Sequence, residues 1–287
     1  MPTIDVLDST MYYEETGSGT PIVFLHGNPT SSYLWRKVLP GIADGRILAP
    51  DMIGMGKSGK PEIPYSFDDH ARYVDAWFDA LGIENPILVG IDWGGSILFD
   101  WAARHPGRTR GLVFMETLVR PMSWSEFPEV ARERFQNYRA PGTGERAVLE
   151  QNAFIQAALR ATVLTPLVEE DRAAYLAPYP TPESRRPMLA WPRQWPLDGE
   201  PADVTRRFEA FGEWFAESKD VPKLLLTFDT SPTLVMRPDS ALLTWCRENI
   251  TSLEVEGCGP AGHMAPEDRP DEIAAAINGF VARHGLS

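Results

Sequence analysis

An acidic side chain, Asp92, lies midway between two glycines, Gly90 and Gly94. An apolar run at residues 86–89 precedes this segment, and a helical pattern follows it from Gly95. Glycines at these positions are typical of a sharp turn from a strand into a helix, because a Cβ would clash where the backbone is strained. Enzymes that use this turn place a nucleophile at its tip. Since a carboxylate is ionised at neutral pH without a base, Asp92 favours displacement at a saturated carbon over acyl transfer.

A second loop, residues 26–29, follows the apolar run at residues 21–25. Because the carboxyl ends of parallel strands meet at one edge of a sheet, we expect this loop to face Asp92. In hydrolases with such a turn, backbone N–H groups of this loop and of the residue after the nucleophile form an oxyanion hole. The amides of Asn28 and Trp93 are the predicted donors.

A histidine that could act as a general base, His263, ends a glycine-rich segment at residues 257–263. Such a loop allows the imidazole to reach over the edge of a sheet toward a nucleophile. The other histidines have weaker cases, and His26 is expected to support its own loop. None of the five histidines is spaced i, i+4 from another, and the two cysteines, Cys246 and Cys258, lack metal-ligand spacing. We therefore expect no metal and no cofactor.

A carboxylate is needed to orient the imidazole, and two residues compete for that role. Glu116 directly follows the predicted strand at residues 111–115, and Asp229 follows the predicted strand at residues 222–228. Position alone does not separate them. Asp51 is a lesser candidate and is expected to fix the loop at residues 51–59.

The elements that must position these side chains alternate between strands and helices, which predicts a mostly parallel sheet. Strands are predicted at residues 4–7, 10–15, 21–25, 46–50, 86–91, 111–115, 222–228 and 252–257. Helices are predicted at residues 68–81, 95–104, 239–248 and 271–283. The resulting fold class is α/β, a central sheet flanked by helices.

Between residues 119 and 215 the pattern changes, because tryptophan, proline and arginine become dense and the apolar positions suit short helices. We interpret this segment as an inserted helical cap and residues 1–118 and 216–287 as the core. Phe154, Leu159 and Trp191 are candidates for lining a substrate cavity under the cap. An amphipathic cap helix would bury such residues in any case.

Charge and composition exclude some partners. The net charge of −13 argues against nucleic acid or an anionic membrane as a partner, because both would repel this surface. The N-terminus lacks the features of a signal peptide, and no apolar run approaches the roughly 18 residues of a membrane helix. We expect a cytoplasmic protein, either a monomer or a homodimer.

Several motifs together resemble the haloalkane dehalogenases of the α/β-hydrolase superfamily over almost the whole chain. They are HGNPTSSYLWR at 26–36, DMIGMGKSG at 51–59, DWG at 92–94, FME at 114–116, PESRRP at 182–187 and GPAGHMAPED at 259–268. The resemblance implies that Asp92 is the nucleophile, His263 the base and Glu116 the acid. It further implies that Asn28 and Trp93 bind the departing halide.

The implied reaction converts a small halogenated hydrocarbon and water into a primary alcohol, halide and a proton through an ester on Asp92. Epoxide hydrolases share the aspartate and the DWGG turn, and Tyr175 and Tyr179 could supply their acids. Coelenterazine-type luciferases are a second alternative on the same fold, and a ligand sensor is a third. Ile91 and residues 264–266 depart from the family pattern, which predicts effects on substrate range and rate.

Overall fold

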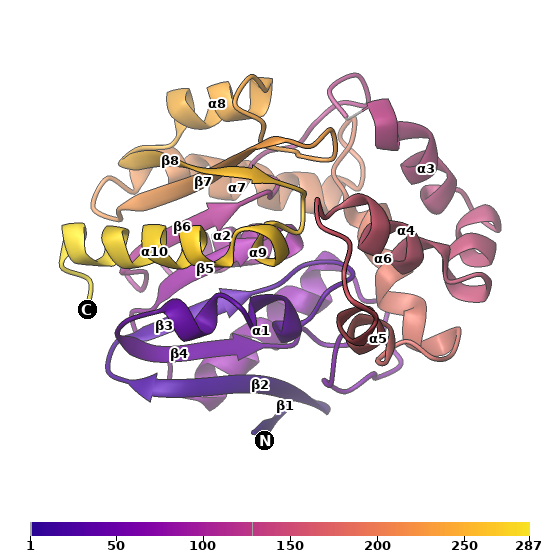
Figure 1. The fold of residues 1–287 in the computed structure, drawn as a ribbon, viewed down its shortest axis with the longest axis horizontal. Coiled ribbons are helices and arrows are strands. Elements are labelled where there is room, and N and C mark those ends of the chain that lie inside the picture. Colours follow the sequence, from indigo (N-terminus) through magenta and orange to yellow (C-terminus); the bar gives the residue numbers. More distant parts are fainter. Residues whose placement is uncertain (1, 128) are drawn as a thin grey trace.

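A computed structural model describes residues 2–127 and 129–287. Within them, one eight-stranded sheet has the order β1-β2-β4-β3-β5-β6-β7-β8 (Figure 1). The strands are β1 (Thr3–Val6), β2 (Ser9–Ser18), β3 (Pro21–Leu25), β4 (Gly45–Pro50), β5 (Ile87–Ile91), β6 (Gly111–Met115), β7 (Lys223–Thr230) and β8 (Leu253–Ala261). Only the β1–β2 and β2–β4 pairs are antiparallel. The predicted α/β class and mostly parallel sheet are confirmed.

The central strands are buried on both faces, which explains why their sequences are continuous apolar runs. Helices α1 (Phe67–Ala80), α2 (Trp93–Arg104), α7 (Ala202–Glu217) and α8 (Ala241–Asn249) pack in the cluster on one face. Helix α10 (Pro270–His284) packs in the cluster on the other, with the short 3-10 helices η1 (Ser32–Trp35) and η2 (Leu39–Gly41). Alternate strand residues such as Val23 and Phe24 belong to the two different clusters.

Strand register brings the predicted site residues to one edge of the sheet. Leu25 of β3 pairs with Gly90 of β5, and Ile91 of β5 pairs with Met115 of β6. The segments that follow these three strands therefore emerge side by side. Strands β7 and β8 continue beyond their predicted ends, since they pair past an irregularity between Thr227 and Asp229.

Between β6 and β7 the described chain is helical, as predicted. It forms α3 (Glu129–Arg139), the π-helix η3 (Glu145–Glu150), α4 (Ala153–Ala161), α5 (Glu169–Leu176), η4 (Glu183–Arg185), α6 (Arg186–Gln194) and α7. Helices α3 to α6 gather beside the sheet in Figure 1, whereas α7 packs on α2, with Phe99 5.6 Å from Phe211 and 4.9 Å from Phe215 between ring centroids. Our division into a cap at 119–215 and a core of 1–118 and 216–287 remains a proposal.

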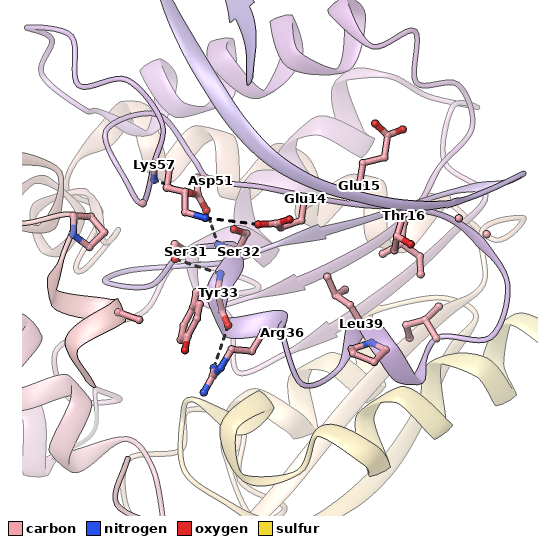
Figure 2. Close-up of a pocket in the computed structure, with 18 of the residues that line it drawn as sticks. Glu14, Glu15, Thr16, Ser31, Ser32, Tyr33, Arg36, Leu39, Asp51 and Lys57 are labelled. Carbon is pink, nitrogen blue, oxygen red and sulfur yellow. Dashed lines mark hydrogen bonds and ion pairs between the residues drawn. The ribbon is translucent and has the colours of Figure 1, made fainter. Parts of the chain in front are cut away.

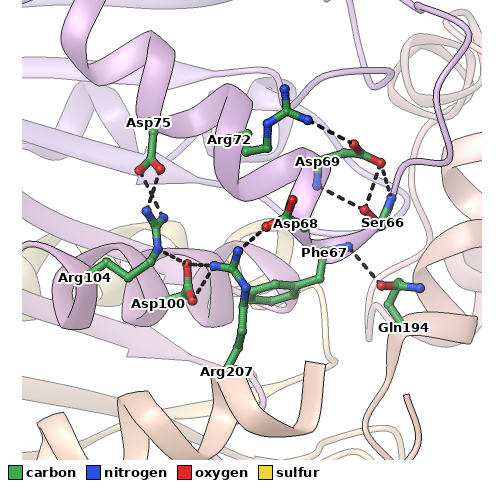
Figure 3. Close-up of polar contacts among 10 residues, drawn as sticks. All are labelled: Ser66, Phe67, Asp68, Asp69, Arg72, Asp75, Asp100, Arg104, Gln194 and Arg207. Carbon is green, nitrogen blue, oxygen red and sulfur yellow. Dashed lines mark hydrogen bonds and ion pairs between the residues drawn. The ribbon is translucent and has the colours of Figure 1, made fainter. Parts of the chain in front are cut away.

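Ion pairs fasten α2, the helix that follows Asp92, to its neighbours (Figure 3). The buried carboxylate of Asp100 accepts hydrogen bonds from Arg104 of the same helix at 2.7 Å and from Arg207 of α7 at 2.9 Å. Arg104 also pairs with Asp75 of α1, and Arg207 with Asp68 of α1. These contacts hold α1, α2 and α7 together. No helix in the described part of the chain has the length and apolar character needed to cross a bilayer.

Candidate active site

Asp92 occupies a strained turn between β5 and α2. It has φ 51° and ψ −134°, and it is the N-cap residue of α2. A Cβ on Gly90 would lie 2.6 Å from Cα of Gly95, and one on Gly94 would lie 2.2 Å from the carbonyl oxygen of Leu25. Both contacts are too short for any side chain. The predicted strand–turn–helix geometry is therefore present, and glycine is required at both flanks.

The two carboxylate oxygens of Asp92 have different partners. Oδ1 accepts the backbone N–H of Asn28 at 2.7 Å, and Oδ2 lies 3.3 Å from Nε2 of His263. A Cβ on Gly27 would lie 2.1 Å from Oδ1, so only glycine allows the 26–29 loop to approach this closely. One oxygen is thus held by a backbone donor, and the other faces the imidazole.

Of the two competing carboxylates, Glu116 is the one beside the histidine. Its Oε2 lies 3.0 Å from Nδ1 of His263, and its two oxygens accept the amides of Val235 at 2.8 Å and Met236 at 3.0 Å. Glu116 is buried, whereas Asp229 is exposed within β7, where its carboxylate accepts the hydroxyl of Thr230 at 2.6 Å. The structure therefore brings Asp92, His263 and Glu116 together and leaves Asp229 apart.

The imidazole of His263 lies between two carboxylates. Burial disfavours its charged form, but the hydrogen bonds and charges of Asp92 and Glu116 outweigh this effect and raise the pKa of His263 from 6.5 to about 10. The two carboxylates therefore favour the protonated form of the imidazole. Loss of the negative charge on Asp92 would remove one of the groups that hold this proton.

The other two polar residues singled out in the 26–59 region support loops, as expected. His26 is buried, and its Nε2 accepts the amide of Met52 at 2.9 Å while Nδ1 donates to the carbonyl of Gly27 at 2.9 Å. Burial lowers the pKa of His26, and an Nε2 atom that accepts an amide N–H carries no proton. Asp51 accepts the amides of Ser32 at 2.6 Å and Lys57 at 2.7 Å. These bonds join the segment at residues 26–32 to the loop at residues 51–59.

A cavity of about 130 Å³ opens onto Asp92, His263, Asn28 and Trp93. Its remaining wall comes mainly from the cap and is mostly apolar. That wall is formed by Phe127, Val130, Ala131, Arg134, Phe135, Tyr138, Phe154, Ala157, Ala158, Ala161, Thr162, Pro192, Trp195, Thr233 and Val235. The side chain of Asn28 donates to the carbonyl of Met188 at 3.4 Å, a long bond.

Of the three cap residues expected to line the cavity, only Phe154 does so, and the expectation was wrong for Leu159 and Trp191. Leu159 is buried on the opposite side of α4 from the stripe that includes Phe154, Ala158 and Ala161. Trp191 is buried and stacks on the ring of Trp93, with centroids 4.6 Å apart, while its N–H points to the sulfur of Met55. Trp191 therefore packs against the face of the Trp93 ring and does not reach the cavity.

Sequence reasoning missed most of the cavity wall. Residues 154, 157, 158 and 161 recur at helical spacing, as do 131, 134, 135 and 138 of α3. This periodicity was a detectable signal, but it does not show which helix face turns toward Asp92. Neither Tyr175 nor Tyr179 lines the cavity, whereas Tyr138 does.

A second hollow, of about 930 Å³, lies between η1, the β2–β4 edge and α5 (Figure 2). Tyr33, Arg36, Asp51 and Lys57 line it, and it contains none of the residues Asp92, His263 and Glu116. In the described part of the chain, no cluster of His, Cys, Asp or Glu is arranged to hold a metal ion. Cys246 and Cys258 are buried free thiols.

Comparisons with known proteins show which family this chain belongs to. A family model described as alpha/beta hydrolase fold matches residues 20–270. A haloalkane dehalogenase of Mesorhizobium japonicum is 45% identical over 97% of this chain and 90% of its own length, and one of Sphingobium indicum is 42% identical over 98% and 94%. The crystal structure of a putative ancestral haloalkane dehalogenase has a TM-score of 0.95, with 44% identity and full coverage of both chains. DbeA of Bradyrhizobium elkanii, also a haloalkane dehalogenase, has a TM-score of 0.93 at 45% identity, covering 99% of this chain and 98% of its own.

Proposed function

Because this chain belongs to the haloalkane dehalogenases of the alpha/beta hydrolase fold, we propose that Asp92, His263 and Glu116 carry out its reaction. The enzyme hydrolyses the carbon–halogen bond of a haloalkane to an alcohol, a halide ion and a proton. The observation that supports the residue assignment best is that the two oxygens of the Asp92 carboxylate have different partners. One oxygen is bound by the Asn28 amide, the other faces His263, and the group opens onto an apolar cavity.

In the first step, Oδ2 of Asp92 attacks the carbon that bears the halogen. A carbon–oxygen bond forms, the carbon–halogen bond breaks, and the electron pair leaves with the halide. Charge then develops on the halogen, and the side-chain N–H groups of Asn28 and Trp93 stabilise it. Both residues line the same cavity as Asp92. The stacking of Trp191 on Trp93 supports this role because it restricts the indole ring.

In the second step, water hydrolyses the ester. Nε2 of His263 accepts a proton from water, the resulting hydroxide attacks Cγ of Asp92, and the alkoxide leaves with the proton from the imidazolium. Asp92 loses the remaining proton and returns to a carboxylate. Oδ1 already accepts the Asn28 amide at 2.7 Å, and the amide of Trp93, at the start of α2, has no intrahelical partner. These two donors stabilise the tetrahedral oxyanion.

Alkylation itself prepares His263 to act as a base. The pKa of His263 is about 10 while Asp92 is charged, so its ring holds a proton in the free enzyme. Ester formation neutralises Asp92 and lowers that pKa toward its ordinary range. Glu116 remains at 3.0 Å from Nδ1 and keeps Nε2 directed toward the ester. His263 then releases its proton to solvent and becomes available as a base after the halide has left. The proton that Asp92 loses after hydrolysis returns the imidazole to its starting state.

Trapping the ester tests this assignment. His263→Phe is incubated with 1-bromobutane, and the intact mass and the peptide that contains Asp92 are measured. We expect one butyl group on Asp92 and a single turnover of bromide, because general-base catalysis of the second step is lost. Asp92→Asn should show no adduct, and His105→Phe should turn over as the wild type does. A folded His263→Phe protein without an adduct would overturn the covalent mechanism.

The same assay separates the epoxide hydrolase alternative. That reaction needs an acid beside the oxygen of the epoxide, and Tyr175 and Tyr179, the two candidates for that acid, do not line the cavity. Tyr138 does line it, so styrene oxide is included as a second substrate. We expect bromide from 1-bromobutane and no diol from styrene oxide. Light emission with coelenterazine is expected to be absent.

We further propose that the enzyme acts in the cytoplasm, where two buried free thiols are compatible with a reducing environment. Cell fractionation with an antibody against this chain tests the compartment. The state of assembly, monomer or homodimer, is accessible by light scattering.

A further inference from the structure

One residue after His263, at Ala265, the chain begins a one-turn helix, α9 (Ala265–Asp268), whose last residue is hydrogen-bonded to the cap. Oδ2 of Asp268 accepts the amide of Gly262 at 2.8 Å and that of Leu164 at 3.0 Å. Oδ1 accepts the amide of Thr165 at 3.2 Å. One carboxylate therefore joins the residue before His263 to two cap residues.

The residue after His263 is joined to the same cap segment without an intermediary. The amide of Met264 donates to the carbonyl of Thr162 at 2.8 Å. A Cβ on Gly262 would lie 2.2 Å from that same carbonyl oxygen, so only glycine allows the two segments to approach this closely. Thr162 also lines the cavity. Both neighbours of His263 are thus fixed to the segment at residues 162–165.

The other carboxylate of α9, Glu267, anchors the helix on its opposite side. It is buried and accepts Arg36 at 2.5 and 3.0 Å, Lys37 at 2.9 Å and the hydroxyl of Tyr175 in α5 at 2.5 Å. Glu267 therefore anchors α9 to residues 36 and 37 of the core and to α5 of the cap through contacts that do not involve Asp268. The distinct effect of the Asp268 bonds is on the backbone around His263.

We propose that Asp268 is a positioning residue that couples cap residues 162–165 to the imidazole of His263. The proposal rests on the assignment of His263 as the base of the second step. The imidazole must keep Nδ1 at 3.0 Å from Glu116 and Nε2 beside Asp92, and a displacement of about 1 Å can cost roughly 100-fold in rate. Charge-assisted bonds from three amides restrict that displacement.

The proposal predicts an unequal effect on the two chemical steps. Formation of the ester uses Asp92 and the halide donors, whereas its hydrolysis uses His263. In Asp268→Asn the side chain keeps its size but loses its charge. Its NH₂ group is a donor, so it cannot accept the backbone N–H groups that the carboxylate binds. We expect hydrolysis to slow by about 10-fold or more and ester formation by less than about 3-fold.

Rapid-quench mass spectrometry with 1-bromobutane measures both rates in single turnovers. Asp268→Asn should accumulate the alkyl-enzyme and release a burst of bromide followed by slow turnover. Asp268→Glu, which restores a carboxylate, should recover part of the hydrolysis rate. Asp271→Asn, an exposed acid at the start of α10, is the matched control and should behave as the wild type does.

Equal slowing of both steps, or a lower melting temperature with an unchanged ratio of the two rates, would overturn the proposal. If Asp268→Asn does not fold, Leu164→Pro is the second variant, because proline lacks the backbone N–H that Asp268 accepts from Leu164. The ratio of the ester-formation rate to the hydrolysis rate is measured in the same way. His263→Phe is run in parallel. If His263→Phe carries the alkyl adduct but Asp268→Asn does not accumulate the alkyl-enzyme, only the proposed role of Asp268 is refuted. If His263→Phe carries no adduct, the proposed mechanism itself is refuted.

Discussion

Nδ1 of His263 lies 3.0 Å from Oε2 of Glu116, and two backbone amides, those of Val235 and Met236, hold the same carboxylate from the other side. Glu116 therefore has three contacts in place before a substrate enters. It can orient the imidazole and offset its charge. This geometry is the reason for proposing Glu116, and not Asp229, as the partner of His263.

Neutralising the two candidate acids should have very different effects. Glu116→Gln places an amide where three donors converge, and turnover should fall by roughly 10⁴-fold, the size seen when the acid of a serine-protease triad is neutralised. Asp229→Asn should stay within about threefold of the wild type, because Asp229 is exposed and away from His263. Steady-state bromide release measures both. A larger loss in the Asp229 variant would reverse the assignment.

The turn at Asp92 should tolerate no side chain at Gly94. A Cβ there would lie 2.2 Å from the carbonyl oxygen of Leu25, so Gly94→Ala should lower the free energy of unfolding by about 1–3 kcal/mol and abolish turnover. Gly212→Ala in α7 is the matched control, since a Cβ there meets nothing within 4 Å. It should raise the free energy of unfolding by up to about 1 kcal/mol. Urea unfolding followed by circular dichroism compares them, and equal stabilities would contradict the steric argument.

The ion pairs of α2 should contribute to stability through Asp100. This buried carboxylate serves Arg104 and Arg207, so Asp100→Asn should cost about 1–3 kcal/mol in the free energy of unfolding. Asp79→Asn, at an exposed position of α1, should change it by less than about 0.5 kcal/mol. Chemical denaturation at low and high salt measures the difference. An Asp100 variant as stable as the Asp79 variant would show that the network in Figure 3 is energetically neutral.

The pH dependence of stability should report the proton on His263. Its pKa is raised from 6.5 to about 10 in the folded state, so the folded protein binds this proton more tightly than the unfolded chain. The resulting stabilisation is complete below pH 6.5 and is lost as the pH rises through about 10. The stability difference between wild type and His263→Phe should therefore shrink across this range. In Asp92→Asn this stabilisation should be lost at lower pH, because one group that raises the pKa of His263 is neutral. A stability difference between wild type and His263→Phe that does not change with pH would contradict the raised pKa of His263.

Local sequence determined the parts of the site that depend on short-range sterics and periodicity. Glycines flanking Asp92 and the glycine in front of Asn28 specify a strained turn and a close loop, and both follow from the space that a Cβ would need. The apolar runs predicted most strand positions, because strands buried on both faces leave no polar position. The alternation of strands and helices predicted a parallel sheet, and such a sheet places residues 26, 92 and 116 at one edge.

Tertiary packing decided what two equivalent local patterns could not. Glu116 and Asp229 each seemed to end a strand, but β7 stays paired with β8 through Thr230, which keeps Asp229 in the exposed end of the sheet, while Glu116 leaves β6 with φ 44° and meets His263. In the cap, Phe154 and Leu159 were equally apolar, and only the docking of α4 on the core turned one toward Asp92 and the other away. Side-chain type predicts burial, but long-range contacts decide against which surface a residue is buried.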